Sequence, residues 1–427
     1  MSTGVIELRE IDLSGDKHLE AVAVERHGAA LLGASAFLTR LFQLSSPWAP
    51  GLCFVGAEAT CPNVPGLAPI STRLHLAGGG LELADALGGC LGECVERLSL
   101  IEHDGDVVST ATHDNAGPLA PALHELIKGH ADRLGASHDV PFDWIAGRCL
   151  HSDDLRLVPA DWVLRRARPG PLFDAPTALS TGAAAARSFA DAAARGLLEL
   201  VERDAAAQWW LGGRRARPLT LEALSNGRVA EQVNQLRQGS RERATWLLDI
   251  TTDLAIPVVA AVSVDAGDGR GFACGLASDL QLSDAAAKAL LELCQIELGL
   301  QLSLMRHRER GGDRLSEEDR RVLARAAALD AARCELLHAT GSPIRHAPAM
   351  TGADAESRLK TIAQAFAHHD IEAVLVDLTR PEFSVPVARA LAPSLQLMPS
   401  RLDTSRLVAA RSLHGGGERW TNGISLM

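Results

Sequence analysis

Residues 196–210, GLLELVERDAAAQWW, carry charged side chains at a spacing that places them on one face of a helix. Glu199, Glu202 and Arg203 stand at positions i, i+3 and i+4, whereas leucine and valine cover most of the remaining surface. Carboxylates surrounded by so much apolar surface are expected to be withdrawn from water, and a buried charge without a partner is costly. The pattern therefore predicts that something positive meets this acidic stripe.

The same spacing occurs a second time in GECVERLS, where Glu93, Glu96 and Arg97 repeat it. For one copy alone, an intrahelical ion pair is an equally good explanation, worth about 0.2–0.5 kcal/mol. Two copies favour a shared site. Carboxylate oxygens suit Mg²⁺, which proteins usually hold with one or two carboxylates together with substrate phosphates. The arginines would then meet phosphate oxygens, so we expect a nucleotide site built without a glycine-rich loop.

A third helix is expected in SDAAAKALLELCQIELGLQLSLM, with Ser283 as its N-cap. Lys288, Glu292 and Gln295 fall on one face of this helix. The remaining positions are mostly apolar. The sequence thus contains a third polar stripe on an otherwise apolar helix.

The elements that must position these stripes include strands expected at residues 245–250, 257–264 and 371–378. The second of these is a nearly continuous run of valine and alanine, which is typical of a strand buried on both faces. Residues 1–75 are interpreted as a mixed α/β segment. A glycine cluster beside a tryptophan in residues 401–427 suggests a mobile tail that can dock. No nucleophile elbow, P-loop or HExxH motif occurs in the chain.

The overall composition narrows the function classes. The chain has 427 residues, 47% of them hydrophobic, and a formal charge of −11. A globular acidic protein is a poor match for the nucleic-acid backbone, whose affinity comes largely from basic side chains. The eight cysteines form no CxxC pair and are expected to be reduced. Because neither a signal peptide nor about 18 consecutive apolar residues are present, we expect a cytoplasmic protein without a membrane segment.

Four blocks of sequence, in order, resemble those of the YcaO superfamily: GECVER, LSTGAAAARSFADAAARGLLELVERDAAAQWW, AKALLELCQ and VDLTRPEFSVPVARALAPSLQ. The similarity covers roughly residues 76–400, so the expected division is 1–75, 76–400 and 401–427. FDWIAGRCLHSDDLRLVPADWVL is similar to the branch that matures azole-containing ribosomal peptides. The resemblance implies a mixed α/β fold (α+β) of the YcaO type, in which a sheet and packed helices form an ATP site.

The resemblance also implies roles for individual residues, with ATP and Mg²⁺ as cofactors. The metal would be held by Glu93, Glu96, Glu199 and Glu202. Catalysis would depend on Glu199, Glu202 and Arg203. The nucleotide would be bound by Ser180, Glu93, Arg97, Lys288, Glu292 and Gln295.

The implied reaction is transfer of phosphate from ATP to an amide oxygen of a precursor peptide, which forms azolines from Cys, Ser or Thr. The implied partners are the precursor peptide and a leader-binding protein similar to ubiquitin-activating enzymes, with a flavin dehydrogenase as a further candidate. Many azoline-forming members end in a PxPxP motif, whereas this chain ends in ISLM. Thioamide or amidine formation therefore stays open as an alternative, as does a noncatalytic assembly or accessory subunit.

Overall fold

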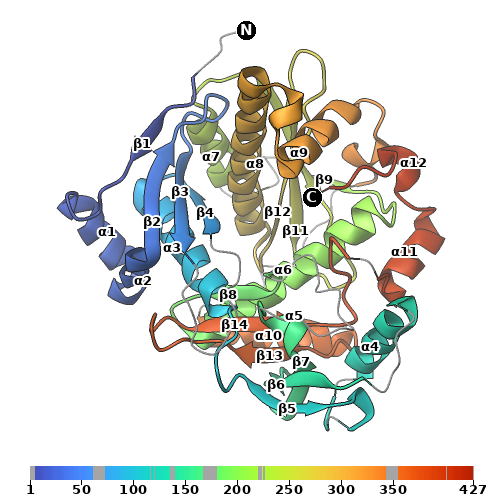
Figure 1. Ribbon diagram of the computed structural model, residues 1–427. Helices are drawn as coiled ribbons and strands as arrows, with labels where there is room; N and C mark the ends of the chain where they lie inside the picture. The colour runs from blue at the N-terminus through green and yellow to red at the C-terminus, as the bar shows by residue number, and fades with distance from the viewer. Residues whose placement is uncertain are drawn as a thin grey trace.

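The computed structural model describes residues 5–60, 73–115, 117–119, 121–134, 140–166, 180–219, 224, 227–342, 354–400 and 402–426. Across these ranges helices pack against three antiparallel sheets, which confirms the mixed α/β class expected from the sequence (Figure 1). The longer helices are α1 (Lys17–His27), α3 (Leu83–Ser99), α4 (Pro121–Leu134), α6 (Phe189–Trp210), α7 (Arg228–Arg237), α8 (Leu282–Arg310), α9 (Glu317–Ala328), α10 (Ala355–His368) and α11 (Ser405–His414). The shorter helices are α2 (Ala29–Gly33), α5 (Ala160–Val163) and α12 (Glu418–Thr421).

The strands of each sheet come from distant parts of the chain. The first sheet has the order β1 (Leu8–Glu10), β2 (Leu38–Leu44), β3 (Cys53–Thr60) and β4 (Arg73–Gly80). The second has the order β12 (Ala273–Ser278), β11 (Val258–Asp265), β10 (Arg243–Asp249) and β9 (Arg217–Leu219). The third has the order β5 (Val107–Ala111), β6 (Phe142–Cys149), β13 (Val374–Asp377), β14 (Val387–Leu391) and β8 (Ala183–Ala185), and β7 (Leu155–Pro159) also pairs with β6.

The helices α3, α6 and α8 lie between the sheets. Helix α3 packs against β4 of the first sheet and β8 of the third, and α6 packs against β8 and β14 of the third sheet and β12 of the second. Helix α8 packs against β11 and β12 of the second sheet and also contacts β4 of the first, so it connects these two sheets. In Figure 1 the three helices approach one another near the middle of the molecule. The three elements that carry the polar stripes therefore surround a common centre.

The second sheet is buried on both faces, as its sequence predicts. Every residue of β11 except Asp265 is buried. Val258, Ala260 and Val262 belong to the core shared with α6, whereas Val259 and Ala261 belong to the core shared with α8. This alternation follows from the two-residue period of a strand, and it fixes α6 and α8 on opposite faces of one sheet.

The start of α8 differs from the prediction. The helix begins at Leu282 after Gln281, and no side chain caps it, so Ser283 is the second helical residue and not the N-cap. Helix α6 has a side-chain cap, because Ser188 accepts a hydrogen bond from the amide of Asp191 at 3.2 Å. Apolar periodicity finds such helices more reliably than their first residue, since ends commonly shift by one or two positions.

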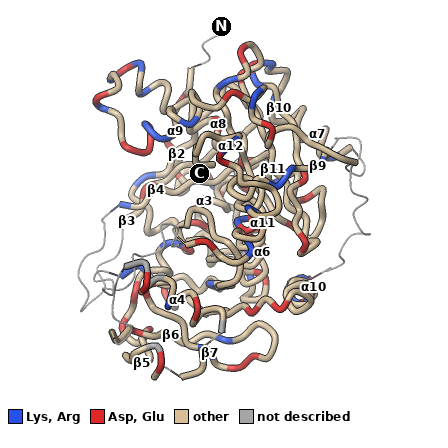
Figure 2. Tube along the Cα trace, turned by 90° about the vertical axis from the view of Figure 1, so that its right-hand side faces the viewer, with Lys and Arg blue, Asp and Glu red and all other residues tan. Residues whose placement is uncertain are grey.

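Residues 402–426 dock against the body of the protein. The Trp210 indole at the end of α6 donates to the carbonyl of Ile424 at 2.7 Å, and Leu426 is buried in the core of α6 and the second sheet. A Cβ on Gly417 would lie 1.7 Å from the carbonyl oxygen of Trp210, so only glycine permits this approach. In Figure 2, Asp and Glu segments lie near the middle of the molecule beside α3 and α6 as well as on the outside. Over the part of the chain that is described, no helix is long and apolar enough to cross a membrane.

Candidate functional site

One glutamate from each of the three inner helices is held by a backbone amide of a neighbouring strand or turn. The amide of Ala77 donates to Glu93 at 2.7 Å, and that of Leu276 donates to Glu292 at 2.9 Å. The amide of Gly182, in the turn before β8, donates to Glu199 at 2.9 Å. In each case the donor lies 16 or 17 residues before the glutamate. One oxygen, Oε2, of each carboxylate is thereby fixed.

Glycines allow the helices to approach closely enough for these hydrogen bonds. A Cβ on Gly78 of β4 would lie 2.0 Å from the Ala86 carbonyl of α3, and one on Gly275 of β12 would lie 2.3 Å from the Ala289 carbonyl of α8. A Cβ on Gly196 of α6 would lie 2.3 Å from the carbonyl of Gly182. A glycine at the point of contact therefore allows each of the three helices to pack closely against the neighbouring strand or turn.

The residue three positions after each glutamate faces the next helix or sheet. Glu96 of α3 lies close enough to Glu199 of α6 for their charges to repel, and Glu202 of α6 is similarly close to Glu292 of α8. Gln295 of α8 packs over β4, where a Cβ on Gly79 would lie 2.7 Å from its amide carbon. The structure therefore brings the three predicted stripes together, with carboxylate pairs at two junctions and a neutral amide at the third.

The predicted cations lie beside the glutamates, with one exception. Arg97 pairs with Glu93 at 2.6 Å, while Arg203 contacts Glu199 at 3.3 Å and Glu202 at 3.0 Å. Lys288 makes its ion pair with Asp279 at 2.5 Å and its side chain is 53% exposed, although its charge still acts on Glu202.

Ser180 stands at the start of the turn before β8, where its carbonyl accepts a hydrogen bond from the amide of Ala183 at 2.8 Å. This turn also contains Gly182, the residue that donates to Glu199. Ser180 is thus close in the chain to the amide that fixes Glu199, although the hydrogen bond above involves its main chain only.

Burial and mutual repulsion raise the pKa values of three of these carboxyl groups. Burial is the main cause for Glu96, whose pKa lies well above its ordinary value, and repulsion from Glu199 and Glu93 adds to it. Burial likewise raises the pKa of Glu202 to about 8, against the opposing effect of Arg203. The pKa of Glu292 is raised by burial, again against Arg203. These carboxyl groups therefore keep their protons to a higher pH than exposed carboxyl groups do.

These carboxylates fit a divalent cation that is shared with a phosphate ligand. Among the described residues, no group of three or more His, Cys, Asp or Glu side chains is arranged to hold a metal by itself. The oxygens come in pairs at the junctions Glu96–Glu199 and Glu202–Glu292. Mg²⁺ is usually held by one or two carboxylates and completes its shell with phosphate and water. Two such pairs with excess negative charge match this donor set.

Arg389 of β14 is a cation near this cluster that the sequence reasoning missed. Its guanidinium is close enough to Glu199 and Glu96 for their charges to interact, and it is 1% exposed. Burial lowers its pKa to about 10, against the opposing effect of the two glutamates. The signal was present in the sequence as a single arginine inside the apolar strand VPVARALAP, because a buried charge requires partners.

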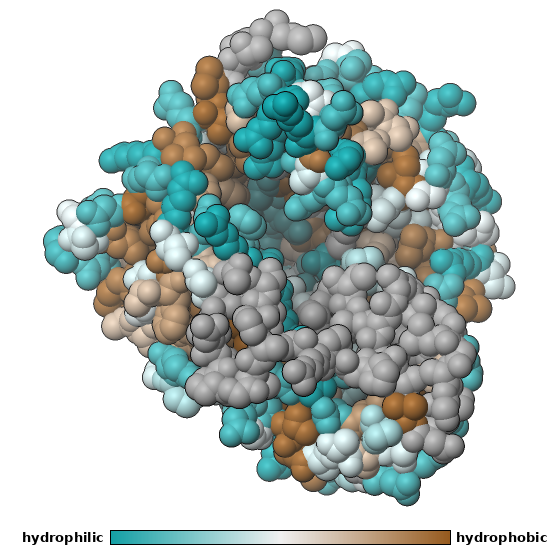
Figure 3. Space-filling model, in the orientation of Figure 1, coloured by the Kyte–Doolittle hydropathy of each residue, from teal (hydrophilic) through white to brown (hydrophobic). Residues whose placement is uncertain are grey.

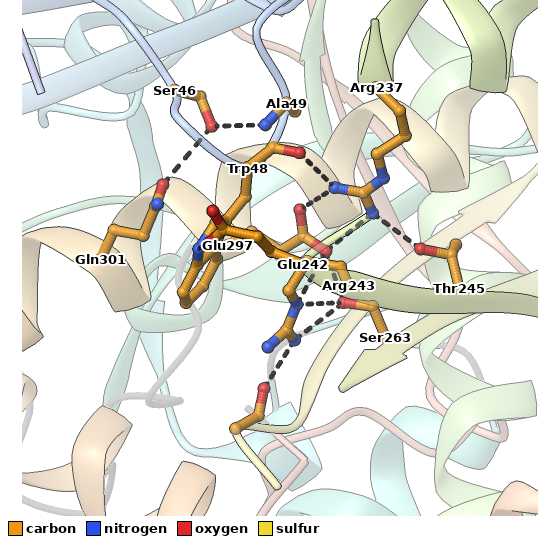
Figure 4. Close-up of polar contacts among 11 residues, drawn as sticks. Ser46, Trp48, Ala49, Arg237, Glu242, Arg243, Thr245, Ser263, Glu297 and Gln301 are labelled. Atoms are coloured by element: carbon orange, nitrogen blue, oxygen red, sulfur yellow. Dashed lines mark hydrogen bonds and ion pairs between the residues drawn. The ribbon is translucent and has the colours of Figure 1, made fainter. Parts of the chain in front are cut away.

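A hollow lies on the face of the molecule seen in Figure 3, near its centre and between the elements of the upper left and upper right. Helix α8 is anchored to its neighbours by Glu297. Glu297 is fully buried and accepts hydrogen bonds from Arg237 at 2.5 and 2.8 Å and from Ser263 at 2.5 Å (Figure 4). Arg243 also contacts Glu297, at 3.4 Å, and its guanidinium lies over the Trp48 ring. This network anchors α8 to α7 and to the second sheet.

The glutamate pairs on three helices, in a sequence without a glycine-rich phosphate loop, have the donor chemistry that suits Mg²⁺ together with a phosphate ligand. A family model described as YcaO cyclodehydratase, ATP- and Mg²⁺-binding, matches residues 77–396. This chain therefore belongs to the YcaO family, and ATP and Mg²⁺ are the cofactors of that family. No curated protein matches the sequence significantly.

Solved structures share the fold at low sequence identity. A heterocyclase in complex with substrate and cofactor has a TM-score of 0.73 and 21% identity, over 92% of this chain and 55% of its own. The heterocyclase TruD has a TM-score of 0.61 and 22% identity, over 78% of this chain and 48% of its own. YcaO from Methanopyrus kandleri, bound with AMPPCP and Mg²⁺, has a TM-score of 0.61 and 18% identity, over 88% and 91%. This chain thus spans about half the length of the two heterocyclases and most of the length of the Methanopyrus protein.

Proposed function

We propose that this chain is the YcaO subunit of a cyclodehydratase complex, which uses Mg²⁺ and ATP to form azolines from Cys, Ser or Thr in a ribosomally made precursor peptide. The observation that supports this best is the set of buried glutamate pairs at the junctions of α3, α6 and α8. Their raised pKa values come mainly from burial, with mutual repulsion adding to it, and carboxyl groups perturbed in this way gather at functional sites.

The residues then take the following roles. Glu199 and Glu202 hold the metal against the triphosphate together with the α3 pair, and Arg203 neutralises the transferring phosphoryl group. Bound Mg²⁺ would supply charge neutralisation at the phosphates. The α3 pair is Glu93 and Glu96, and the further nucleotide contacts are Ser180, Arg97, Lys288, Glu292 and Gln295.

The proposed chemistry needs no nucleophile from the protein. A Cys, Ser or Thr side chain of the peptide attacks the preceding amide carbon, and the amide oxygen takes the γ-phosphoryl group of ATP, releasing ADP. That oxygen then leaves as phosphate. The thiol or hydroxyl proton and the amide proton are also lost, which leaves the C=N bond of the azoline. The peptide thereby loses the elements of one water, which appear in the hydrolysis of ATP to ADP and phosphate. The protein holds the reacting groups in line and excludes solvent.

The proposed partners are the precursor peptide and a leader-binding protein similar to ubiquitin-activating enzymes, with a flavin dehydrogenase acting later on azolines. An E. coli microcin synthetase complex, McbBCD with pro-MccB17 bound, shares the fold at a TM-score of 0.57 and 16% identity. Its assembly with other subunits supports a partner for this chain. We also propose the division into residues 1–75, 76–400 and 401–427, and a cytoplasmic location.

Residues 424–426 lie close to the elements that carry the glutamates. Arg325 of α9 donates to the carbonyl of Leu426 at 2.7 Å. The charges of Arg325, Glu202 and Glu292 all act on the thiol of Cys274. Residues 424–426 therefore lie in the neighbourhood of Glu202 and Glu292, and Arg325 connects the two regions.

The test is to incubate the chain with Mg²⁺, ATP, the peptide encoded beside its gene and any partner purified with it, and to weigh the peptide. Loss of one water per modified residue is the expected result, whereas exchange of oxygen for sulfur would indicate thioamide formation. Glu202→Gln should abolish the change, while Glu102→Gln, which alters an equally buried glutamate paired with Arg166, should not. A wild-type protein that neither alters the peptide nor releases phosphate would instead support the alternative of a noncatalytic assembly or accessory subunit.

A further inference from the structure

Arg389 links two segments that are far apart in the sequence. Its guanidinium donates to the carbonyl of Thr181, in the turn before β8, and to the carbonyl of Trp162 of α5 at 3.1 Å. A lysine could not reach both acceptors with the same geometry, because only guanidinium presents its donors in a rigid planar fork.

The turn that Arg389 holds is the one that fixes Glu199. Gly182 has a φ of +88°, its carbonyl accepts from the amide of Ala390 at 2.7 Å, and its own amide donates to Glu199 Oε2 at 2.9 Å. The adjacent Thr181 carbonyl is the acceptor for Arg389. One strand, β14, therefore secures both carbonyls of this turn, and the amide between them points at a carboxylate of the cluster.

We propose that Arg389 is a positioning residue for the metal, which acts by holding residues 180–182 so that Gly182 fixes Glu199 Oε2 and thereby orients Oε1, the oxygen that Arg203 contacts at 3.3 Å, toward the cation. This role rests on the proposed Mg²⁺–ATP site. Arg389 also supplies positive charge beside Glu199 and Glu96 without being exposed enough to bind the nucleotide itself. Its contribution is thus to the geometry of the Glu96–Glu199 junction.

Arg380 offers a matched control for the ordinary structural role of a buried arginine. It is 7% exposed and donates to the carbonyls of Ser99 at 3.1 Å and Ile101 at 2.9 Å, just as Arg389 donates to two carbonyls. Its charged partner is Asp106, at 2.7 Å, which lies outside the glutamate cluster. Loss of the guanidinium fork at this position should affect folding stability but not the response to metal.

The experiment measures ATP binding by calorimetry in the full chain while Mg²⁺ is varied. Arg389→Lys should raise the Mg²⁺ concentration for half-maximal ATP binding about tenfold, whereas Arg380→Lys should stay within about twofold of the wild type. Equal midpoints for Arg389→Lys and the wild type would overturn the proposal. Failure of the wild type to bind ATP with Mg²⁺ would instead reject the proposed function.

Two further variants separate positioning from a general loss of structure. In a Glu199→Gln background, Arg389→Lys should have little additional effect on the Mg²⁺ midpoint, because the two residues act through one contact. Fully additive effects would contradict the proposal. Should Arg389→Lys fail to fold, Gly182→Ala disturbs the same turn, since its Cβ would lie 2.5 Å from the Ala390 carbonyl. That variant should also raise the midpoint, and an unchanged midpoint would count against the proposal.

Discussion

Replacing Glu202 by glutamine in the metal-free protein separates a functional carboxylate from a structural ion pair by the sign of its effect. If Glu202 serves mainly as a partner of Arg203, its neutralisation leaves a buried guanidinium with less compensation and destabilises the fold by about 3–5 kcal/mol. If Glu202 belongs to a site that disfavours its charged form, removal of its ionisable group relieves the cost of burying that charge and the repulsion from Glu292 and Glu199. We expect the second result at alkaline pH.

The magnitude follows from the raised pKa of Glu202. The unfolded chain releases the carboxyl proton near the ordinary pKa of 4.5, whereas the folded protein retains it up to about 8. Between these values the folded state binds more protons, so stability falls as pH rises and levels off above the folded pKa. One pKa unit corresponds to about 1.4 kcal/mol. Between about pH 6 and about pH 9 the wild type should therefore lose about 3 kcal/mol relative to Glu202→Gln, which does not titrate.

The assay is denaturant unfolding of both proteins at the two pH values, with a chelator present. Under these conditions Glu202→Gln should gain stability relative to the wild type as pH rises. When Mg²⁺ and ATP are supplied in place of the chelator, they should stabilise only the wild type. Glu102→Gln serves as control, since Glu102 is as buried as Glu202 and pairs with Arg166 at 2.9 Å outside the cluster. A constant loss of stability in Glu202→Gln at both pH values, as expected for the control, would refute the site interpretation.

Two substitutions test the placement of α8. Gly79→Ala should destabilise the protein by about 1–3 kcal/mol, because its Cβ would lie 2.7 Å from Gln295. In thermal melts, adding Gln295→Ala should restore part of the lost stability. If the double variant shows no rescue, the contact with Gln295 is not the cause of the loss. Glu297→Gln should lower the free energy of unfolding by about 3 kcal/mol, because Arg237 and Arg243 lose a fully buried partner. The unfolding midpoint of Glu297→Gln should fall, while the Mg²⁺ concentration required for ATP binding should stay the same. A changed Mg²⁺ requirement would show that the network does more than anchor the helix.

The helices and their polar faces were predictable because they depend on local periodicity. Glu199 and Glu202 lie three apart on an apolar helix, and this spacing alone predicts a shared face, which α6 confirms. The strand at residues 257–264 was predictable for the same reason, since β11 covers Val258–Asp265.

The relations between elements were not predictable, because nothing local specifies which distant segments meet. Strand β8 pairs with β14, about two hundred residues later, and Arg389 reaches Thr181 across that pairing. Lys288 pairs with Asp279 although Glu292 lies one turn away on the same face. Choices of this kind depend on the packing of the sheets and not on the helical pattern.

The charge of the assembled cluster makes a final prediction about the order of binding. At alkaline pH, where all are ionised, five glutamates (Glu93, Glu96, Glu199, Glu202 and Glu292) stand against four cations (Arg97, Arg203, Arg389 and Lys288), which gives a formal charge of −1. Such a site repels a free triphosphate, and the repulsion is strong where water is excluded. Calorimetry at alkaline pH with a chelator should therefore show ATP affinity at least about tenfold weaker than with Mg²⁺, a difference of about 1.4 kcal/mol or more. Because the cation compensates both the protein and the nucleotide, equal affinity in the two conditions would mean that these glutamates do not face the phosphates.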